Sequence, residues 1–278
     1  MMKTSKLLTA VLAALMVGTV PAARAQVSVP APSRTPDVIY VPTPQPVVDA
    51  MLRLAKVQKN EMVYDLGCGD GRAVVTAARD FGARGVGVDI DPQRIEESNA
   101  NVAKANVSDR VKIMEADLFQ MQFADADVLF LYLLPALNVR LRPRILDELR
   151  PGTRVVSNSF SMAEWEADEQ EEIEDKTIYF WMVPAKVAGE WKVSLPDNEE
   201  ATLSLTQEFQ KVSGSVKAKD KTWTVNDGRL RGTALTFNLG EGTGAGRVTA
   251  EFAGGQLKGT VQLEGKSQLA PWTAQLKR

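Results

Sequence analysis

The feature that most constrains the fold of this chain is a change in hydrophobic pattern near residue 186. Before it, short apolar runs alternate with segments whose apolar residues recur every three or four positions. Alternating strands and helices are typical of a mostly parallel sheet covered by helices on both faces. After it, apolar and polar residues alternate one by one, as in antiparallel strands with one face toward water. The sequence therefore predicts an α/β domain over residues 38–186 and a smaller antiparallel β domain over residues 187–278.

The expected elements of the α/β domain follow each other in a regular order. Strands are expected over 62–65, 85–89, 111–115, 126–131 and 154–157, and helices over 44–55, 72–81, 92–105 and 138–149. Thr43 is expected to cap the first helix, with Pro44 at its first helical position. Pro143 is expected to interrupt the last helix.

Glycines separate the alternating runs of the second domain. Of the 20 glycines, 12 lie beyond residue 187, where hairpin turns need them. The regular spacing predicts an up-and-down meander that closes into a small barrel or a sandwich. Small barrels usually have an interior filled by side chains, although some hold a ligand.

The first 25 residues have the pattern of a signal peptide. Lys3 and Lys6 precede an apolar run over residues 7–20, and Ala23 and Ala25 form a small-x-small cleavage signal. We expect residues 1–25 to be removed, residues 26–37 to form an extended leader, and the protein to be exported, to the periplasm in a bacterium. An uncleaved membrane anchor is the alternative, but the run is shorter than the roughly 20 residues that span a bilayer. No stable membrane span is expected after cleavage.

Composition excludes several kinds of site. The chain has no His and one Cys, which excludes His-dependent triads and tetrahedral zinc sites, and we expect no metal. The formal net charge is −2, and residues 26–187 alone carry 18 basic and 25 acidic residues, a net charge of −7. An acidic domain of this kind does not favour a nucleic acid as partner.

Three glycines join the first expected strand of the sheet to the helix that follows it. Asp65 precedes Gly67, Gly69 and Gly71, and the next strand ends in Asp89. Glycines let the backbone turn sharply and approach a ligand, and a helix N-terminus presents free N–H groups to it. An acid after the second strand can accept ribose hydroxyls. The G-x-G-x-G spacing differs from the G-x-G-x-x-G of nicotinamide binders.

These residues resemble the class I methyltransferases that use S-adenosylmethionine. Asp65 with Gly67, Gly69 and Gly71 matches their first motif, and Asp89, followed by Ile90, matches their ribose-binding acid. Ala116-Asp117-Leu118 after the third strand matches their adenine-side motif. The resemblance implies that S-adenosylmethionine is the cofactor, and that Asp117 and Leu118 also bind it.

Two further segments resemble a narrower group, the lysine methyltransferases that include the ATP synthase c-subunit lysine methyltransferases and their bacterial relatives. They are Tyr40 to Pro44 (Tyr-Val-Pro-Thr-Pro) and Leu131 to Pro135 (Leu-Tyr-Leu-Leu-Pro). The resemblance implies N-methylation of a lysine amine, with Tyr132 as the catalytic candidate that lines the acceptor pocket. It also implies that Tyr40 and Thr43 close over the cofactor.

Alternatives remain at several of these positions. Tyr132 can instead pack under the sheet, and Thr43 can act only as a helix cap. The Asn/Asp-Pro-Pro-aromatic signature of many amine methyltransferases is absent, so the acceptor atom stays open. The expected partner is a lysine-bearing protein or a small amine. The alternative function is an exported, non-catalytic envelope protein with a vestigial nucleoside-binding domain, whose β domain binds a ligand or partner.

An acidic stretch follows the last expected strand of the α/β domain. Eight acids lie between Glu164 and Asp175, around Trp165 and Ile173. Such a run usually forms a solvated surface. It can also form an electrostatic collar for a cationic substrate, with Trp165 offering a cation–π face.

Overall fold

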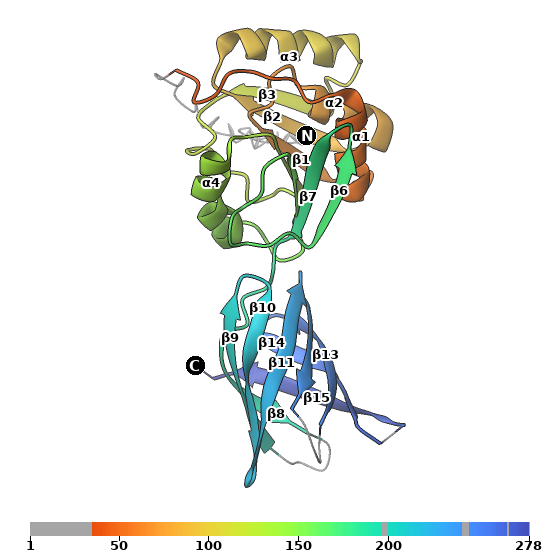
Figure 1. Ribbon diagram of the computed structural model, residues 1–278. Helices are drawn as coiled ribbons and strands as arrows, with labels where there is room; N and C mark the ends of the chain where they lie inside the picture. The colour runs from red at the N-terminus through yellow and green to blue at the C-terminus, as the bar shows by residue number, and fades with distance from the viewer. Residues whose placement is uncertain (1–34, 196–199, 241–244, 266, 278) are drawn as a thin grey trace, which may run out of the picture. The chain divides into compact units, whose positions relative to one another are not determined.

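The computed structural model (Figure 1) describes residues 35–195, 200–240, 245–265 and 267–277. The expected signal peptide and all but the last three residues of the expected leader lie outside the described residues.

A seven-stranded sheet forms the first domain, in the order β3-β2-β1-β4-β5-β7-β6. Five strands are parallel: β1 Met62–Leu66, β2 Arg84–Asp89, β3 Val111–Glu115, β4 Val128–Leu131 and β5 Arg154–Asn158. An antiparallel hairpin, β6 Glu169–Ile173 and β7 Lys176–Met182, extends the sheet beyond β5. The mostly parallel, Rossmann-like sheet is confirmed.

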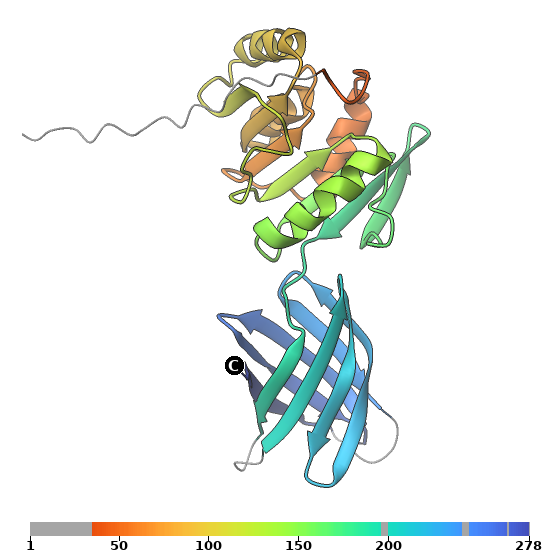
Figure 2. The same cartoon turned by 90° about the vertical axis from the view of Figure 1, so that its left-hand side faces the viewer.

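Helices cover both faces of this sheet (Figures 1 and 2). They are α1 Gln45–Leu54, α2 Arg72–Phe81, α3 Pro92–Lys104 and α4 Pro135–Glu148. Strand β4 shows the reason, because every one of its residues is buried and successive side chains point to opposite faces. Leu129 and Leu131 pack in the same core cluster as Leu141 and Ile145 of α4, whereas Val128 and Phe130 pack in the cluster of α1.

Three expectations about the helices are wrong: the first residue of α1, the Thr43 cap and the interruption at Pro143. Helix α1 begins one residue later than expected, with Pro44 in an extended conformation at the N-cap position. Thr43 does not cap it, because the Thr43 side chain is buried and its hydroxyl accepts a hydrogen bond from Asn158 Nδ2 at 3.4 Å. Helix α4 runs through Pro143 rather than being interrupted there. Leu141 and Ile145 on either side are fully buried, and this packing offsets the lost backbone hydrogen bond.

The second domain is a closed eight-stranded barrel, which confirms the antiparallel β domain and decides for a barrel over a sandwich. Each strand pairs with the next, and the last pairs with the first. The strands are β8 Gly189–Ser194, β9 Glu200–Glu208, β10 Lys211–Ala218, β11 Lys221–Arg231, β12 Ala234–Leu239, β13 Gly246–Ala253, β14 Gln256–Leu263 and β15 Leu269–Leu276.

The barrel core is made by the alternating apolar residues, among them the buried Trp191, Leu257 and Trp272. Gly259 permits a close strand approach, because a Cβ atom there would lie 1.9 Å from the Thr249 carbonyl oxygen. Across the described parts of both domains, no helix combines the length and apolar character needed to cross a membrane.

Candidate functional site

The turn between β1 and α2 is built from three glycines in left-handed conformations. Their φ angles are +89° at Gly67, +53° at Gly69 and +74° at Gly71. Residues with a Cβ atom rarely adopt such angles, which explains the glycine at each alternate position. The Gly67 and Cys68 N–H groups donate to the Val88 carbonyl oxygen at 2.8 and 2.9 Å. The turn is therefore tied directly to the carboxyl end of β2.

Asp89, the last residue of β2, adds a hydrogen bond that holds the glycine turn against this strand. Its Oδ2 accepts a hydrogen bond from Gly69 N–H at 2.8 Å, and its Oδ1 accepts from Ile90 N–H at 2.8 Å and Asp91 N–H at 3.0 Å. A carboxylate offers about four acceptor positions, so a further donor such as a ligand hydroxyl can still bind. Asp89 is thus held in one orientation before any ligand arrives.

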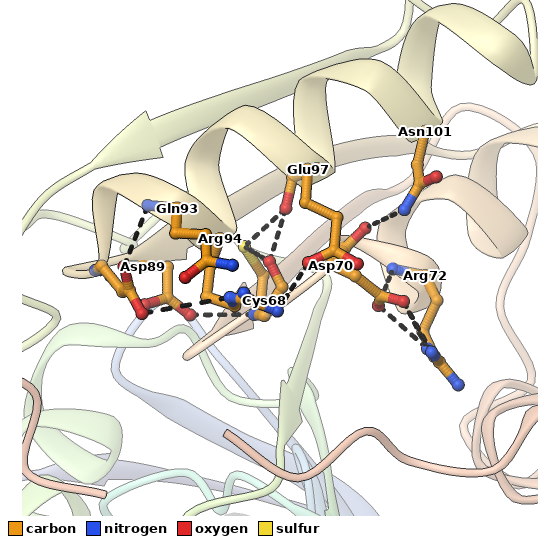
Figure 3. Close-up of polar contacts among 11 residues, drawn as sticks. Cys68, Asp70, Arg72, Asp89, Gln93, Arg94, Glu97 and Asn101 are labelled. Atoms are coloured by element: carbon orange, nitrogen blue, oxygen red, sulfur yellow. Dashed lines mark hydrogen bonds and ion pairs between the residues drawn. The ribbon is translucent and has the colours of Figure 1, made fainter. Parts of the chain in front are cut away.

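Helix α3 holds the turn from the other side (Figure 3). Ser98 Oγ donates to the Gly69 carbonyl oxygen at 2.6 Å, and Asn101 Nδ2 donates to the Asp70 carbonyl oxygen at 2.9 Å. These side-chain bonds satisfy carbonyl groups that the turn leaves without a helical or sheet partner. The local geometry of the turn is therefore fixed by β2 and α3 together.

An ion pair connects the turn to the segment before α1. Arg72 donates to the Asp70 carboxylate through Nε at 2.9 Å and Nη2 at 2.6 Å, and through Nη1 to the Thr43 carbonyl oxygen at 2.8 Å. Burial raises the pKa of Asp70, but the hydrogen bonds and charge of Arg72 outweigh it and lower that pKa below its usual value. Asp70 and Arg72 therefore hold residues 35–44, the entrance segment, against the turn.

Tyr40 of the entrance segment lies over the middle glycine. A Cβ atom at Gly69 would lie 2.2 Å from Tyr40 Cε2, so only glycine leaves room for the ring. The Arg94 guanidinium lies 4.6 Å from the centre of the same ring. Burial, and then the negative charge of Asp70, raise the pKa of the Tyr40 hydroxyl. These contacts hold the Tyr40 ring over the glycine turn, and its closing role over the cofactor stays a prediction.

Asp65 lies beneath the turn, 4% exposed, at the end of β1. Burial is the main cause that raises the pKa of its carboxyl well above the usual value, and the charges of Asp89 and Asp70 raise it further. No hydrogen bond from another described residue compensates for this burial. A positively charged ligand group would favour the ionised form of Asp65.

These residues surround a pocket of about 270 Å³ at the carboxyl ends of β1, β2 and β4. Nine of the expected site residues line it, namely Tyr40, Thr43, Asp65, Gly67, Asp89, Ile90, Asp117, Leu118 and Tyr132. Gly69 and Gly71 do not line it, because the Tyr40 ring covers Gly69 and Gly71 caps α2 against Ser98. The pocket also includes residues that the sequence does not single out, above all Phe160.

Tyr132 lies at one end of this pocket and is half-buried rather than packed under the sheet. Its ring stacks on Phe160, with the ring centres 6.2 Å apart and the planes at 18°. Three large apolar side chains at this pocket are exposed to solvent, namely Ile39, Val41 and Leu134. The lining that follows β4 and β5 is aromatic and apolar, with Tyr132, Leu133 and Phe160, whereas β1 and β2 contribute the acids Asp65 and Asp89.

Asp117 of the expected adenine-side motif forms a hydrogen bond within its own turn. Asp117 Oδ1 accepts a hydrogen bond from Phe119 N–H at 2.9 Å, which shapes the turn after β3.

Burial raises the pKa of the Cys68 thiol well above its usual value, and the Asp65 and Asp89 carboxylates raise it further. A buried neutral thiol is a filler of the turn rather than a nucleophile. Within the described ranges, no cluster of acidic or Cys side chains could hold a metal ion.

Four of the eight acids in the acidic stretch form ion pairs within the protein. Glu164 pairs with Arg142 at 2.7 Å, Glu166 with Lys211 at 2.7 Å, Asp168 with Arg229 at 2.8 Å, and Glu169 with Arg231. Trp165 is fully buried and stacks on Phe209, so it cannot offer a face to a substrate cation. The alternative of an electrostatic collar is therefore not supported at Glu164 to Glu169, because these acids already have basic partners.

Comparison with known proteins identifies the first domain. The family model described as the ANTKMT methyltransferase domain matches residues 65–169. A protein-lysine N-methyltransferase of Saccharolobus islandicus is 43% identical over 156 residues, which cover 97% of that protein and 54% of this chain. The ATP synthase c-subunit lysine N-methyltransferase of Mus musculus is 28% identical, and the match covers 51% of it and 46% of this chain.

A solved structure matches the same part of the chain. It is described as an RNA methyltransferase from Salinibacter ruber in complex with S-adenosylhomocysteine. It is 47% identical to this chain, with a TM-score of 0.52, and the match covers 96% of it and 53% of this chain.

The chain belongs to the S-adenosylmethionine-dependent methyltransferases, within the family of the ANTKMT methyltransferase domain. Its enzymatic activity is methyl transfer, and its cofactor is S-adenosylmethionine. The pocket fits this cofactor, since Asp89 still has acceptor capacity for a hydroxyl and Asp65 forms no ion pair with any described residue. The alternative of a non-catalytic protein is not supported.

Proposed function

We propose that this methyltransferase acts on the amine of a lysine side chain in a protein substrate. One observation carries the proposal: a single pocket extends from the cofactor-motif acids to the half-buried Tyr132–Phe160 pair and the apolar Leu133 and Leu137. An apolar and aromatic end suits an alkyl stem that ends in nitrogen. The names of the two curated relatives, both lysine methyltransferases, support the same acceptor.

The residues of the pocket supply what such a reaction needs from a protein. When bound, S-adenosylmethionine supplies a methyl group on a positively charged sulfur atom. Asp65 and Asp89 would hold the cofactor from one side, and Tyr40 would cover it from the other. The acceptor nitrogen must be neutral, so that its lone pair forms the new N–C bond while the C–S electron pair stays on sulfur.

The apolar end favours this neutral amine. Burial beside Tyr132, Leu133 and Phe160 would lower the pKa of a lysine, because a charged ammonium is poorly solvated there. The proton then leaves to solvent before transfer. Positioning and exclusion of water can carry such a displacement without a dedicated base, so the absence of His in this chain is compatible with it.

RNA is the competing acceptor, because the matching solved structure is described as an RNA methyltransferase. Charge favours a protein instead. Residues 26–187 carry a net charge of −7, which repels a polyanion and attracts a lysine-rich surface. Lysine in a protein therefore agrees better with both the pocket and the charge of the domain.

The test supplies methyl-labelled S-adenosylmethionine to the purified chain together with total protein or total RNA from the same cells. We expect label in protein, located on lysine by mass spectrometry of peptides, and no label in RNA. The Asp89→Ala variant serves as the control for enzyme-dependent transfer. Label in RNA alone would show that RNA, and not a protein lysine, is the acceptor.

We also propose that residues 1–25 direct export to the periplasm. The support is their sequence pattern of Lys3, Lys6, an apolar run and a small-x-small signal. Fractionation of cells that produce the full chain with a C-terminal tag tests this. A shortened chain in the periplasmic fraction is expected. A full-length chain in the membrane fraction would indicate the uncleaved anchor instead.

A further inference from the structure

The turn after β5 carries an aromatic ring into the pocket. Ser159 adopts a left-handed conformation, with φ +64°, and Phe160 N–H donates to the Asn158 carbonyl oxygen at 2.8 Å. Non-glycine residues adopt this conformation at a cost, so the surrounding structure must hold it. The consequence is that the Phe160 ring lies in the lining of the pocket, although nothing in the local sequence singles it out.

Two fully buried polar side chains hold this turn. Ser157 Oγ donates to the Phe160 carbonyl oxygen at 2.7 Å. Asn138 Nδ2, from α4, lies 3.1 Å from the same carbonyl oxygen and 3.2 Å from Ser157 Oγ. Both residues are 0% exposed. A buried amide on an apolar helix face is costly unless it makes such bonds, which gives Asn138 a positioning role.

Phe160 and Tyr132 come from different strand ends and meet in the pocket. Tyr132 follows β4 and Phe160 follows β5, two neighbouring parallel strands. Ring centres 6.2 Å apart with planes at 18° form an offset stack, too close for an alkyl chain to enter between them. Each ring covers one face of the other, so their outer faces and edges remain to line the pocket, and we call this pair the aromatic wall.

We propose that the aromatic wall of Tyr132 and Phe160 recognises the acceptor as a primary amine on an unbranched alkyl stem, and that Asn138 positions the wall. The proposal rests on the proposed function and names the feature of the pocket that selects the acceptor. Aromatic faces pack against methylene groups and attract a cationic ammonium before it loses its proton. Leu133 and Leu137 complete the apolar surroundings of the stem.

The first test uses butylamine, which reproduces the lysine stem and its amine. Its binding to the full chain saturated with S-adenosylhomocysteine is titrated for wild type and Phe160→Leu. We expect about tenfold weaker binding in the variant, because the aromatic face is lost while apolar volume remains. The matched control is Phe252→Leu, the same substitution at a half-buried barrel position outside the pocket.

Phe252→Leu should bind both butylamine and S-adenosylhomocysteine as wild type does. Equal butylamine affinity in wild type and Phe160→Leu, or no measurable butylamine binding to wild type, would contradict the proposal that the aromatic wall recognises the acceptor.

The second test asks whether Asn138 acts through Phe160. Asn138→Ala should weaken butylamine binding, and the double variant with Phe160→Leu should bind no more weakly than Phe160→Leu alone. Ser157→Ala removes the other donor to the same carbonyl oxygen and serves if Asn138→Ala does not fold. Full additivity of the two substitutions would show that Asn138 does not position Phe160.

Methylation and butylamine binding test the proposed function and the aromatic wall separately. If wild type methylates lysine but Phe160→Leu does not change butylamine binding, the proposed function is supported and the role of the aromatic wall is contradicted. Butylamine binding that depends on Phe160, without methylation of any protein lysine, would leave the wall standing and make a free alkylamine the acceptor.

Discussion

Asp65 is deeply buried and lies near two other carboxylates, so its ionisation should make the stability of the protein depend on pH. Burial, followed by Asp89 and Asp70, makes the pKa of Asp65 higher in the folded chain than in the unfolded chain. Between those two values the folded protein binds more protons, so stability falls as the pH rises. The stability that the protein gains by keeping Asp65 protonated is fully present below the unfolded pKa, and it is lost as the pH rises through the folded pKa.

We therefore expect Asp65→Asn to gain stability relative to wild type as the pH rises from about 4 to about 8, because the variant has no charge to bury. Urea unfolding without cofactor, at a series of pH values, measures the difference. Saturation with S-adenosylmethionine should reduce the effect, since its positive charge favours ionised Asp65. A difference that does not depend on pH would show that Asp65 does not titrate as described.

Asp89 unites the glycine turn with β2, and its replacement should affect ligand binding. We expect Asp89→Ala to weaken binding of S-adenosylhomocysteine by about 1 to 3 kcal/mol, because a charged acceptor is lost from a partly buried site. Calorimetric titration measures the change. Asp109→Ala, at an exposed acid outside the pocket, is the matched control. Identical affinities for Asp89→Ala and wild type would remove Asp89 from the site.

At the residue scale, the sequence predicts those site residues that belong to a local motif. Asp65 and Gly67 are recognisable because glycine spacing beside a strand has a direct backbone cause. Phe160 and Asn138 are not recognisable, since a hydrogen bond between positions 22 residues apart brings them together and leaves no local pattern. The local sequence suggests a capping role for Thr43 that is wrong, because its true partner, Asn158, lies on a distant strand.

The β6–β7 hairpin is the element that the sequence does not predict. Strand β6 is mostly acidic, with Glu169, Glu171 and Glu172 among its five residues, and it shows no apolar alternation. It forms because β7, which carries the buried Ile178, Phe180 and Trp181, pairs with it along its length. Tertiary pairing here overrides a local pattern that is typical of a solvated loop.

Asp168 stabilises this hairpin through buried contacts. Its carboxylate accepts hydrogen bonds from Met182 N–H at 2.9 Å and from Arg229 at 2.8 Å, and its side chain is 2% exposed. Asp168→Asn should cost about 1 to 3 kcal/mol of stability. Asp175→Asn, at the exposed hairpin tip, should change stability by less than about 0.5 kcal/mol. Thermal and urea unfolding of both variants compare them, and equal costs would contradict the role of Asp168.

At the scale of the whole molecule, the change of hydrophobic period predicts both sheets, because the period depends only on which faces are buried. It does not predict which residues of the two parts contact each other. Lys211, Arg229 and Arg231 of the barrel pair with the acidic stretch, and Phe209 stacks on Trp165. These contacts between distant segments have no signature in either segment alone.

The pocket residues all lie between positions 36 and 160, so the barrel supplies none of the lining. The Saccharolobus islandicus relative, 97% of which matches this chain, covers only 54% of it. We expect a fragment of residues 26–186 to bind S-adenosylhomocysteine within about tenfold of the full chain. It should unfold at a lower temperature, because Trp165 loses Phe209. A soluble fragment without binding would show that the barrel is needed for the pocket.

The most direct measurement is a calorimetric titration of the purified full chain with S-adenosylhomocysteine and, separately, with NAD. We expect one S-adenosylhomocysteine site per chain and no NAD binding, because the turn at Gly67, Gly69 and Gly71 lacks the dinucleotide spacing and Asp65 favours a cationic ligand. If no S-adenosylhomocysteine binding is detected, or if NAD binds equally strongly, the assignment of S-adenosylmethionine to this pocket is contradicted.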